Sequence, residues 1–327
     1  MHLPVRAPFH LEATVRVLQR RPANLIDRWE AQRYRRAIRL HGRPMLIEVG
    51  NSGTIDTPDL ELTILGRTSP KSTAAAARLA REILGLDLDP SPPQRRAEAE
   101  PALRATARAL KGMRPPRYPD LLETFANVIP FQQVSLEAGM AVVAHLVRRF
   151  GEDFVVDGRR HHLFPSAQTL ATAHERSLRA CGMSTHKSRA LSAIAKAIAA
   201  GDLSAQALAT LPSREAMERL MQLSGIGPWS AALVLLRGFR RLDVFPRADT
   251  GAEGSLARLL HLRSKSSLAR VIERFGDFRG YLYFYGLASR LLEAGLIRPV
   301  GSEALLRPSQ PHGRGAHANA SLVRKNT

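Results

Sequence analysis

The sequence contains one cysteine, Cys181, among 327 residues. A single cysteine excludes an internal disulfide framework, and it cannot supply the four thiolates of a zinc or iron–sulfur site. The neighbours His161 and His162 lack the i, i+4 spacing of helical metal ligands, so we expect them in a solvated loop. The sequence therefore predicts no metal site built from side chains.

Long apolar runs are also absent. No stretch approaches the roughly 20 apolar residues that cross a bilayer, and no secretory signal is recognisable. Hydrophobic residues make up 44% of the chain and aromatic residues 6%, which is typical of a globular protein. We expect a cytoplasmic protein, and a chain of this length has room for two domains.

Acidic residues are in deficit. There are 29 of them against 48 lysines and arginines, which gives a formal net charge of +19. Such an excess favours a polyanionic partner, with nucleic acid as the first candidate. Arginine far outnumbers lysine, however, and a GC-rich genome enriches arginine without any functional reason. Charge alone therefore does not decide the partner.

The first 90 residues mix helical and strand patterns. Leu11, Val15 and Leu18 recur at helical spacing, and the Arg-Arg-Pro sequence at 20–22 ends that helix. Residues 45–49 and 60–65 are apolar or alternating and are separated by turn residues, which predicts antiparallel strands. Residues 74–84 are rich in alanine and leucine. Residues 1–90 therefore predict a small α+β domain with helices packed on one antiparallel sheet.

The rest of the chain has a different character. Several prolines follow residue 89, so we expect residues 91–114 to form an exposed connection. Residues 115–300 show almost wholly helical periodicity and predict a compact helical domain. From 307 to 327 the chain holds four basic residues and no acid, which predicts a disordered basic tail. The expected fold class is α+β, mainly α.

Three residues in the helical part are candidate helix caps. Gly201 follows an apolar helical stripe and is a plausible left-handed C-terminal cap. Ser204 and Ser213 are candidate N-caps of the next two helices.

The segment from 220 to 249 carries the most information. A helical pattern is followed by Gly225, Ile226 and Gly227, and Pro228 stands where a proline can begin a second helix. Two glycines let the backbone approach a ligand closely, and the N–H groups of the next helix N-terminus suit a phosphate oxygen. The alternative is a plain turn between two helices, with Ile226 plugging the core.

This pattern resembles the signature of the helix-hairpin-helix DNA glycosylase superfamily. Residues 224–229 read SGIGPW, and Asp249 follows 22 residues after Gly227 (249 − 227 = 22). The segments 131–135, 178–183 and 187–191 resemble further parts of the same family. Residues 8–84 resemble the small sheet domain that precedes the helical body in the 3-methyladenine-DNA glycosylase II branch. The resemblance implies base excision on DNA.

The resemblance also assigns the reaction type. Bifunctional relatives carry a lysine just past the hairpin, where this chain has Trp229, and an indole cannot form their Schiff base. A monofunctional enzyme that leaves an abasic site is therefore implied, with Asp249 as the catalytic carboxylate. Asp249 also suits a helix N-cap, and the two roles are compatible. Asp243 is a competitor that we expect to cap a helix or pair with nearby arginines.

Base extrusion needs a wedge and a pocket. The resemblance places the wedge at Gln133, although a solvated surface glutamine is the alternative. The flipped base needs aromatic faces, which Trp229 and an aromatic cluster could supply, although such a cluster is more often core. The cluster comprises Tyr281, Tyr283, Phe284 and Tyr285. The remaining residues expected to bind DNA are Gln132, Ser224, Gly225, Ile226, Gly227 and Ser230.

Some positions depart from the family pattern or stay ambiguous. Leu233 and Leu287 stand where the alkylation enzyme has aromatic residues, which puts the exact substrate in doubt. Arg237, Arg240 and Arg241 follow the hairpin helix and serve either phosphate contacts or a solvated surface.

The sequence thus predicts a monomeric, nucleoid-associated glycosylase that acts on alkylated purines in double-stranded DNA. No organic cofactor is expected, and the family implies a Na⁺ or K⁺ ion at the hairpin backbone. The alternative is a non-catalytic DNA-binding protein. A lyase that uses Lys187 or Lys196 is disfavoured, because we expect neither lysine to lie beside the hairpin.

Overall fold

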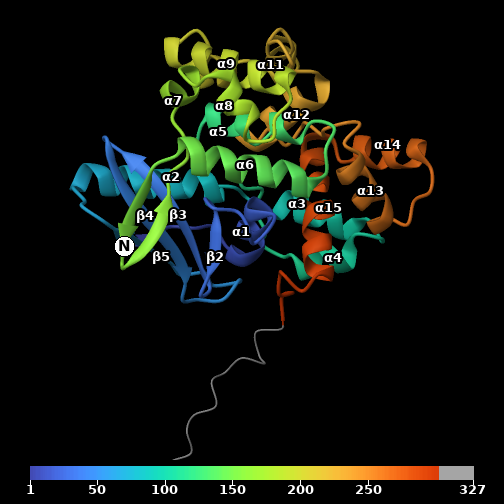
Figure 1. The fold of residues 1–327 in the computed structure, drawn as a ribbon. Coiled ribbons are helices and arrows are strands. Elements are labelled where there is room, and N and C mark those ends of the chain that lie inside the picture. Colours follow the sequence, from blue (N-terminus) through green and yellow to red (C-terminus); the bar gives the residue numbers. More distant parts are fainter. Residues whose placement is uncertain (302–327) are drawn as a thin grey trace, which may run out of the picture.

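A five-stranded antiparallel sheet forms from the N-terminal part of the chain (Figure 1). The computed structural model describes residues 1–301, so the tail predicted for 307–327 lies outside the described residues. The strands are β1 (His2–Leu3), β2 (Arg28–Glu30), β3 (Arg33–Leu40), β4 (Arg43–Asn51) and β5 (Leu60–Leu65), in the order β1-β5-β4-β3-β2. The predicted antiparallel strands at 45–49 and 60–65 are confirmed as β4 and β5.

Strand β3 was not predicted from the sequence. It reads RYRRAIRL, and its four arginines mask the alternation of apolar and polar residues that predicts a strand. Tyr34, Arg36 and Ile38 are buried, which is the period-2 pattern of one strand face. Because Arg36 occupies a core-facing position, the strand does not show the apolar alternation on which the prediction relies.

Helix α1 (Leu11–Gln19) confirms the first predicted helix and lies between the two parts of the molecule. Leu11, Val15 and Leu18 belong to the apolar core beneath the sheet, which they share with α2 (Pro70–Leu84). Ala13 and Val17 belong instead to the core of the helical body. The helix is therefore apolar on both sides, and it carries its C-terminal end into the junction between the domains.

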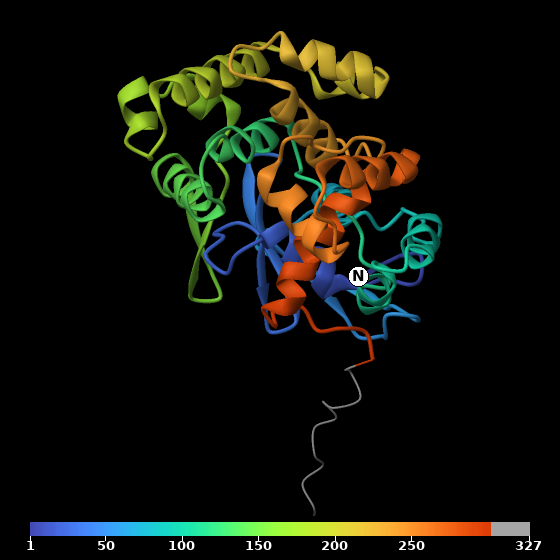
Figure 2. The same cartoon turned by 90° about the vertical axis from the view of Figure 1, so that its right-hand side faces the viewer.

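The helical body packs around α12 (Pro228–Gly238), which is buried from Ser230 to Arg237. Figures 1 and 2 show α7, α8, α9 and α11 on one side of the molecule and α13 and α14 on another, with α6 close to the sheet. The other elements are α5 (Leu121–Ala126), η1 (Ile129–Phe131), α6 (Leu136–Phe150), β6 (Asp153–Val156), β7 (Arg159–His162), α7 (Ala167–Ala171), α8 (Glu175–Arg179), α9 (Thr185–Ala200), α10 (Ala205–Thr210), α11 (Ser213–Met221), α13 (Thr250–Leu259), α14 (Lys265–Arg274), η2 (Gly276–Phe278) and α15 (Arg279–Glu293).

Residues 91–114, which we expected as an exposed connection, contain two helices. These are α3 (Ser91–Ala99) and α4 (Arg104–Ala109). Ala97 and Ala107 are fully buried in the core of the helical body. Pro90 is the N-cap of α3, and Pro92 and Pro93 lie in its first turn, where proline is tolerated.

Two of the three predicted caps are confirmed. Gly201 ends α9 with a left-handed φ of 86°, and the Ser204 hydroxyl accepts the N–H of Ala207 at 3.4 Å. The prediction for Ser213 is wrong, because Pro212 precedes α11 as its cap and makes no side-chain capping bond.

Arg237 and Arg240 point inward, so both roles predicted for these two arginines are wrong. Arg237 is fully buried and donates from Nη2 to the carbonyl of Val17 at 3.3 Å. Arg240 donates to the carbonyl of Ile83 at 3.0 Å, at the end of α2. Arg241 is half-buried and donates to the carbonyls of Ala209, in the last turn of α10, and of Leu211, directly after it. Arg237 and Arg240 thereby join the helical body to the N-terminal domain.

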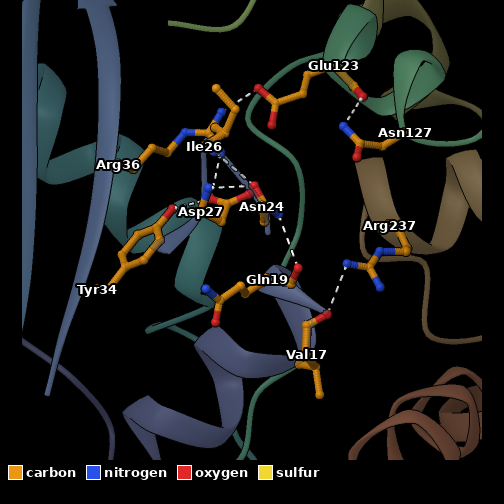
Figure 3. A network of polar contacts seen from close by, with 10 residues as sticks. All are labelled: Val17, Gln19, Asn24, Ile26, Asp27, Tyr34, Arg36, Glu123, Asn127 and Arg237. Atoms are coloured by element: carbon orange, nitrogen blue, oxygen red, sulfur yellow. Dashed lines mark hydrogen bonds and ion pairs between the residues drawn. The ribbon is translucent and has the colours of Figure 1, made fainter. Parts of the chain in front are cut away.

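A buried ionic cluster forms a further link between the domains (Figure 3). Arg36 on β3 pairs with Asp27 at 2.7 Å and with Glu123 on α5, and Tyr34 donates to Asp27 at 2.8 Å. Burial raises the pKa of Glu123 to about 8, against the attraction of Arg36. One guanidinium thus serves two buried carboxylates, and one of them is stable in its protonated form.

This cluster also fixes the end of α1. The Asn24 side chain accepts the N–H groups of Ile26 and Asp27 at 2.9 and 3.0 Å, and it donates to the carbonyl of Gln19 at 3.2 Å (Figure 3). Gln19 is the last residue of α1. The sheet, the ionic cluster and the helix end are therefore held together immediately before Arg20.

The histidine pair lies on strand β7, so the predicted solvated loop is wrong. His161 is buried and contacts the Phe154 ring at 5.7 Å between centroids. Within residues 1–301, no group of three or more histidine, cysteine, aspartate or glutamate side chains is arranged to hold a metal ion. In the same range, none of the helices combines the length and apolarity needed to cross a membrane.

Candidate active site

A cleft of about 1270 Å³ opens between the end of α1 and the hairpin before α12. The helix-end segment from Asn127 to Glu137 and the start of α9 form two of its walls. The start of α13 and the face of α15 form the others. The predicted site residues that line it are Gln132, Gln133, Gly225, Ile226, Gly227, Trp229, Ser230, Asp249 and Tyr283.

The hairpin presents backbone to this cleft. Gly225 has a φ of 81°, and a Cβ there would lie 2.8 Å from the Cβ of Ala190, so only glycine fits. The Ile226 side chain is only 5% exposed and belongs to the core, as the alternative interpretation held. Gly227 has no neighbour within 4 Å of its Cβ position, so the backbone at this point is open to a ligand.

Helix α12 begins at Pro228 without a side-chain cap. The first N–H groups of a helix have no partner within it, and they carry the positive end of the helix dipole. An uncapped helix start beside an open glycine suits a phosphate oxygen. Ser224 is exposed but lies outside the cleft lining.

Gln132 ties the helix-end segment to the hairpin. Its Nε2 donates to the carbonyl of Gly225 at 2.8 Å and to the hydroxyl of Ser230 at 2.9 Å. Ser230 itself is only 2% exposed. These two predicted DNA-binding side chains therefore bind each other, and their contribution is to position the hairpin.

The next two residues form an exposed tip. Gln133 is exposed and has a left-handed φ of 54°, which is uncommon for a residue with a side chain. Val134 beside it is 45% exposed, although it is apolar. Val134 was not among the predicted site residues, because the residue types of a short loop do not reveal which of its side chains is exposed.

The Asp249 carboxylate is held by two hydrogen bonds. Oδ1 accepts the N–H of Ala252 at 2.8 Å, which makes Asp249 the N-cap of α13, and Oδ2 accepts the indole N–H of Trp229 at 3.0 Å. The carboxylate lines the cleft, so it combines the capping role with an accessible position. Asp243 is exposed and makes no hydrogen bond or ion pair within the described residues, so the structural role expected for it is wrong.

The tyrosines of α15 divide between core and cleft. Tyr283 lines the cleft, whereas Tyr281 and Tyr285 are each 2% exposed and lie outside its lining. The Tyr285 hydroxyl donates to Gln94 at 3.4 Å, and burial raises the pKa of Tyr281 to about 12. The prediction that Tyr281 and Tyr285 form the base pocket is therefore wrong, and the core alternative holds for both.

Lys187 also lines the cleft, which the sequence did not suggest. Its Nζ donates to the carbonyl of Pro130 at 3.0 Å, and burial lowers the pKa of this amine. Lys196 is exposed and lies outside the cleft lining. The reason given for setting a lyase aside is therefore wrong for Lys187, which lines the same cleft as the hairpin although α10 and α11 come between the two in the sequence.

Arg20 is a cleft residue that sequence reasoning missed altogether. Only 7% of it is exposed, and its guanidinium carbon lies 4.9 Å from the centroid of the Phe131 ring. In the sequence, Arg20 was taken only as part of the end of α1. An arginine directly after an apolar helix was the available signal, but its burial depends on the junction of the two domains.

Comparison with known proteins places this geometry in a family. The model of the HhH-GPD superfamily base excision DNA repair proteins matches residues 126–276, and that of the AlkA N-terminal domain matches residues 1–120. A DNA-3-methyladenine glycosylase from Bacillus subtilis is 30% identical over 207 residues, which are 62% of this chain and 68% of that protein. The chain belongs to the HhH-GPD superfamily.

Two further HhH-GPD relatives agree with this membership. DNA-3-methyladenine glycosylase 2 of Escherichia coli is 33% identical over 55% of this chain, which spans 61% of that protein's length. The solved structure of a 3-methyladenine DNA-glycosylase from Archaeoglobus fulgidus superposes with a TM-score of 0.75 at 26% identity, covering 89% of this chain and 98% of that chain. The predicted order of sheet domain and helical body is thereby confirmed.

Proposed function

We propose that this protein is a monofunctional DNA glycosylase, which hydrolyses the N-glycosidic bond of a damaged, alkylated purine extruded from duplex DNA. The observation that carries the proposal is the Asp249 carboxylate, which two hydrogen bonds hold in a cleft beside an uncapped helix N-terminus. The relatives named as 3-methyladenine glycosylases support the substrate class.

The carboxylate suits the charge that develops in this reaction. As the bond between C1′ and the base breaks, its electron pair leaves with the base and positive charge develops on the sugar. A carboxylate already fixed in place stabilises that charge without reorganising. Water then adds to C1′, and in this proposal Asp249 orients it and accepts its proton. An abasic site and the free base are the products.

The rest of the cleft binds DNA in this account. The backbone from Gly225 to Gly227 and the start of α12 hold a phosphate, while Gln133 and Val134 fill the space left by the extruded nucleotide. Trp229 and Tyr283 offer aromatic faces to the base. The protein acts as a monomer, and its excess of basic residues favours the encounter with duplex DNA.

A Na⁺ or K⁺ ion at the hairpin is compatible with the residues present. The carbonyls of Leu223 and Gly225 each accept one hydrogen bond, from the Ile226 N–H and from Gln132, so each retains a second lone pair. Such an ion would add positive charge beside the phosphate.

Base release separates this proposal from a non-catalytic DNA-binding protein. The protein is incubated with duplex DNA methylated by dimethyl sulfate, the released bases are quantified by chromatography, and DNA binding is measured in parallel. We expect free methylated purines and unbroken strands that become alkali-labile. DNA binding without release of any base would favour the binding protein instead.

A further inference from the structure

A run of basic residues lies at the end of α13, in the loop after it and at the start of α14. Between Glu253 and Glu273 the chain contains no aspartate or glutamate. The same range contains three arginines, one lysine and one histidine, and all five are exposed. We call these residues the α13–α14 basic segment: Arg258, His261, Arg263, Lys265 and Arg270.

The charges of this segment are not used to hold the protein together. The side chains of Arg258, Arg263 and Lys265 make no hydrogen bond or ion pair within residues 1–301. At the other end of α14, by contrast, Arg274 pairs with Glu100 at 2.8 Å. Three neighbouring cations of the basic segment are therefore available to a partner from outside.

Helix stability does not account for these charges either. Lys265 is the first residue of α14, where a cation meets the positive end of the helix dipole and opposes helix formation. The first turn of α14 contains no acidic residue that would offset it. Arg263 stands only two positions earlier and adds a charge of the same sign. Positive charge is thus gathered at a cost that a bound polyanion would relieve.

Helix α13 connects the basic segment to the cleft. Gly251 and Ser255 line the cleft, and Arg258 shares their face of the helix because it follows Ser255 by three residues (258 − 255 = 3). Leu256 lies on a different face and is fully buried in the core. From Asp249 to Arg258 there are nine residues (258 − 249 = 9). At a rise of 1.5 Å per residue, this is about 14 Å, or the length of about four nucleotides in a DNA strand.

We propose that the α13–α14 basic segment is a second DNA-binding surface, which holds backbone phosphates about four nucleotides from the extruded base. Duplex DNA is stiff over such a length, so a duplex with one nucleotide beside Asp249 continues past α13. The hairpin holds the strand at the lesion, and the basic segment holds its flank. Arg258 favours DNA over an acidic protein as the partner, because it extends the face of α13 that lines the cleft.

This inference rests on the proposed function, since it takes duplex DNA as the partner, and it adds a binding surface outside the cleft. The test variant combines Arg258→Gln, Arg263→Gln and Lys265→Gln. Glutamine is a good helix former and keeps much of the length of these side chains. Because all three residues are exposed and unpaired within the described part of the chain, the variant should fold as the wild type does.

A matched control removes the same charges elsewhere. It combines Arg43→Gln, Arg67→Gln and Lys71→Gln, which are again two exposed arginines and one exposed lysine without ion pairs in the described residues. Lys71 belongs to α2, and the two arginines line a small pocket with the start of that helix. Figure 1 shows α2 on the left of the molecule and α13 and α14 on the right. The control therefore has the net charge of the test variant but leaves the basic segment intact.

The first measurement is the salt dependence of DNA binding. Fluorescence anisotropy follows binding to a duplex that carries an abasic-site analogue with about ten base pairs on either side. Each phosphate contact contributes about 0.9 to the slope of log K against log salt concentration, so we expect the slope of the test variant to be smaller by about 2 to 3. The control should keep a slope within about 1 of the wild type. An unchanged slope in the test variant, or an equal change in the control, would overturn the inference.

The second measurement shortens the DNA. One flank or the other is cut to about three base pairs, which removes the phosphates that the basic segment would contact. For one of the two flanks, the difference in affinity between the wild type and the test variant should disappear. A difference that persists on both shortened duplexes would also overturn the inference.

Base release separates this inference from the proposed function. Single-turnover release at saturating protein should be unchanged in the test variant, because Asp249 and the hairpin are untouched. A large loss at saturation would show that the segment acts on the cleft and not as a binding surface. Release of no base by the wild type would overturn the proposed function, whereas the salt slopes would still decide whether the segment binds DNA.

Discussion

The indole N–H of Trp229 donates to Oδ2 of Asp249 at 3.0 Å, and this bond joins the helix after the hairpin to the N-cap of α13. The two residues are 20 positions apart in the chain (249 − 229 = 20). At the position where the resemblance places the nucleophilic lysine of bifunctional relatives, this chain has an indole that binds the carboxylate. The residue that replaces the lysine, Trp229, is therefore also the residue that helps to hold the aspartate in place.

Trp229→Phe tests this feature, because it keeps an aromatic face and removes the donor. A hydrogen bond to a charged group contributes about 1.5–3 kcal/mol, so we expect base release under single-turnover conditions to slow by about one to two orders of magnitude. DNA affinity should change little. The control is Trp29→Phe on β2, which lies outside the cleft. An unchanged rate in Trp229→Phe would show that Ala252 alone orients the carboxylate.

Because Lys187 lines the cleft, the expected absence of lyase activity needs an experimental test. Its amine lies in the cleft with a lowered pKa, yet it donates to the carbonyl of Pro130. We expect borohydride to trap no covalent complex between the wild type and damaged DNA. A trapped complex that disappears in Lys187→Met but persists in Lys196→Met would identify Lys187 as the nucleophile and contradict a monofunctional mechanism.

The exposed tip tests base extrusion. Gln133→Ala combined with Val134→Ala removes the two exposed side chains that we propose to fill the space of the extruded nucleotide. Because unstacking and unpairing cost a few kcal/mol, and less at a mismatch, we expect a loss of about tenfold on a paired lesion and a smaller loss on a mispaired one. If the rate of base release falls equally on the paired and the mispaired lesion, the tip does not act in base extrusion.

The ionic cluster at the domain junction predicts a pH dependence of stability. The pKa of Glu123 is raised to about 8 in the folded protein, from 4.5. Between these pH values the folded state holds a proton that the unfolded state releases, so the free energy of unfolding falls as pH rises, by at most about 1.4 kcal/mol per pH unit.

Glu123→Gln removes this titration. We expect the fall in unfolding free energy between pH 5.5 and 8 to be smaller in Glu123→Gln than in the wild type, as measured by urea denaturation. Glu218→Gln is the matched control, since its carboxylate is 57% exposed in a surface pair. If the unfolding free energy falls by the same amount in the wild type and in both variants, a group other than Glu123 holds the proton.

The parts of the site that were predictable are local in sequence. The glycines at 225 and 227, Pro228 and the capping aspartate each act through their nearest neighbours, so a pattern of residue types predicts them. The tyrosines of α15 could have been sorted in the same way. Residues 281 and 285 are four apart and share one face of a helix, whereas residue 283 lies on the opposite face.

The parts that were missed depend on contacts between distant segments. Arg237 bonds to Val17 across 220 positions, and Arg240 bonds to Ile83 across 157. When an arginine binds a backbone carbonyl, its partner cannot be recognised from the sequence, because every residue has a carbonyl. The burial of Arg20 depends on the same domain junction. Inward arginines were therefore taken for surface or DNA-binding residues.

The most direct test of the account is the single-turnover rate of base release by Asp249→Asn. Asparagine is also a good N-cap, so α13 should keep its start while the negative charge is lost. We expect the rate to fall by about a hundredfold or more, with DNA binding retained. Asp243→Asn, which changes an exposed carboxylate outside the cleft, should stay near the wild-type rate. A fully active Asp249→Asn would contradict the catalytic role of this carboxylate.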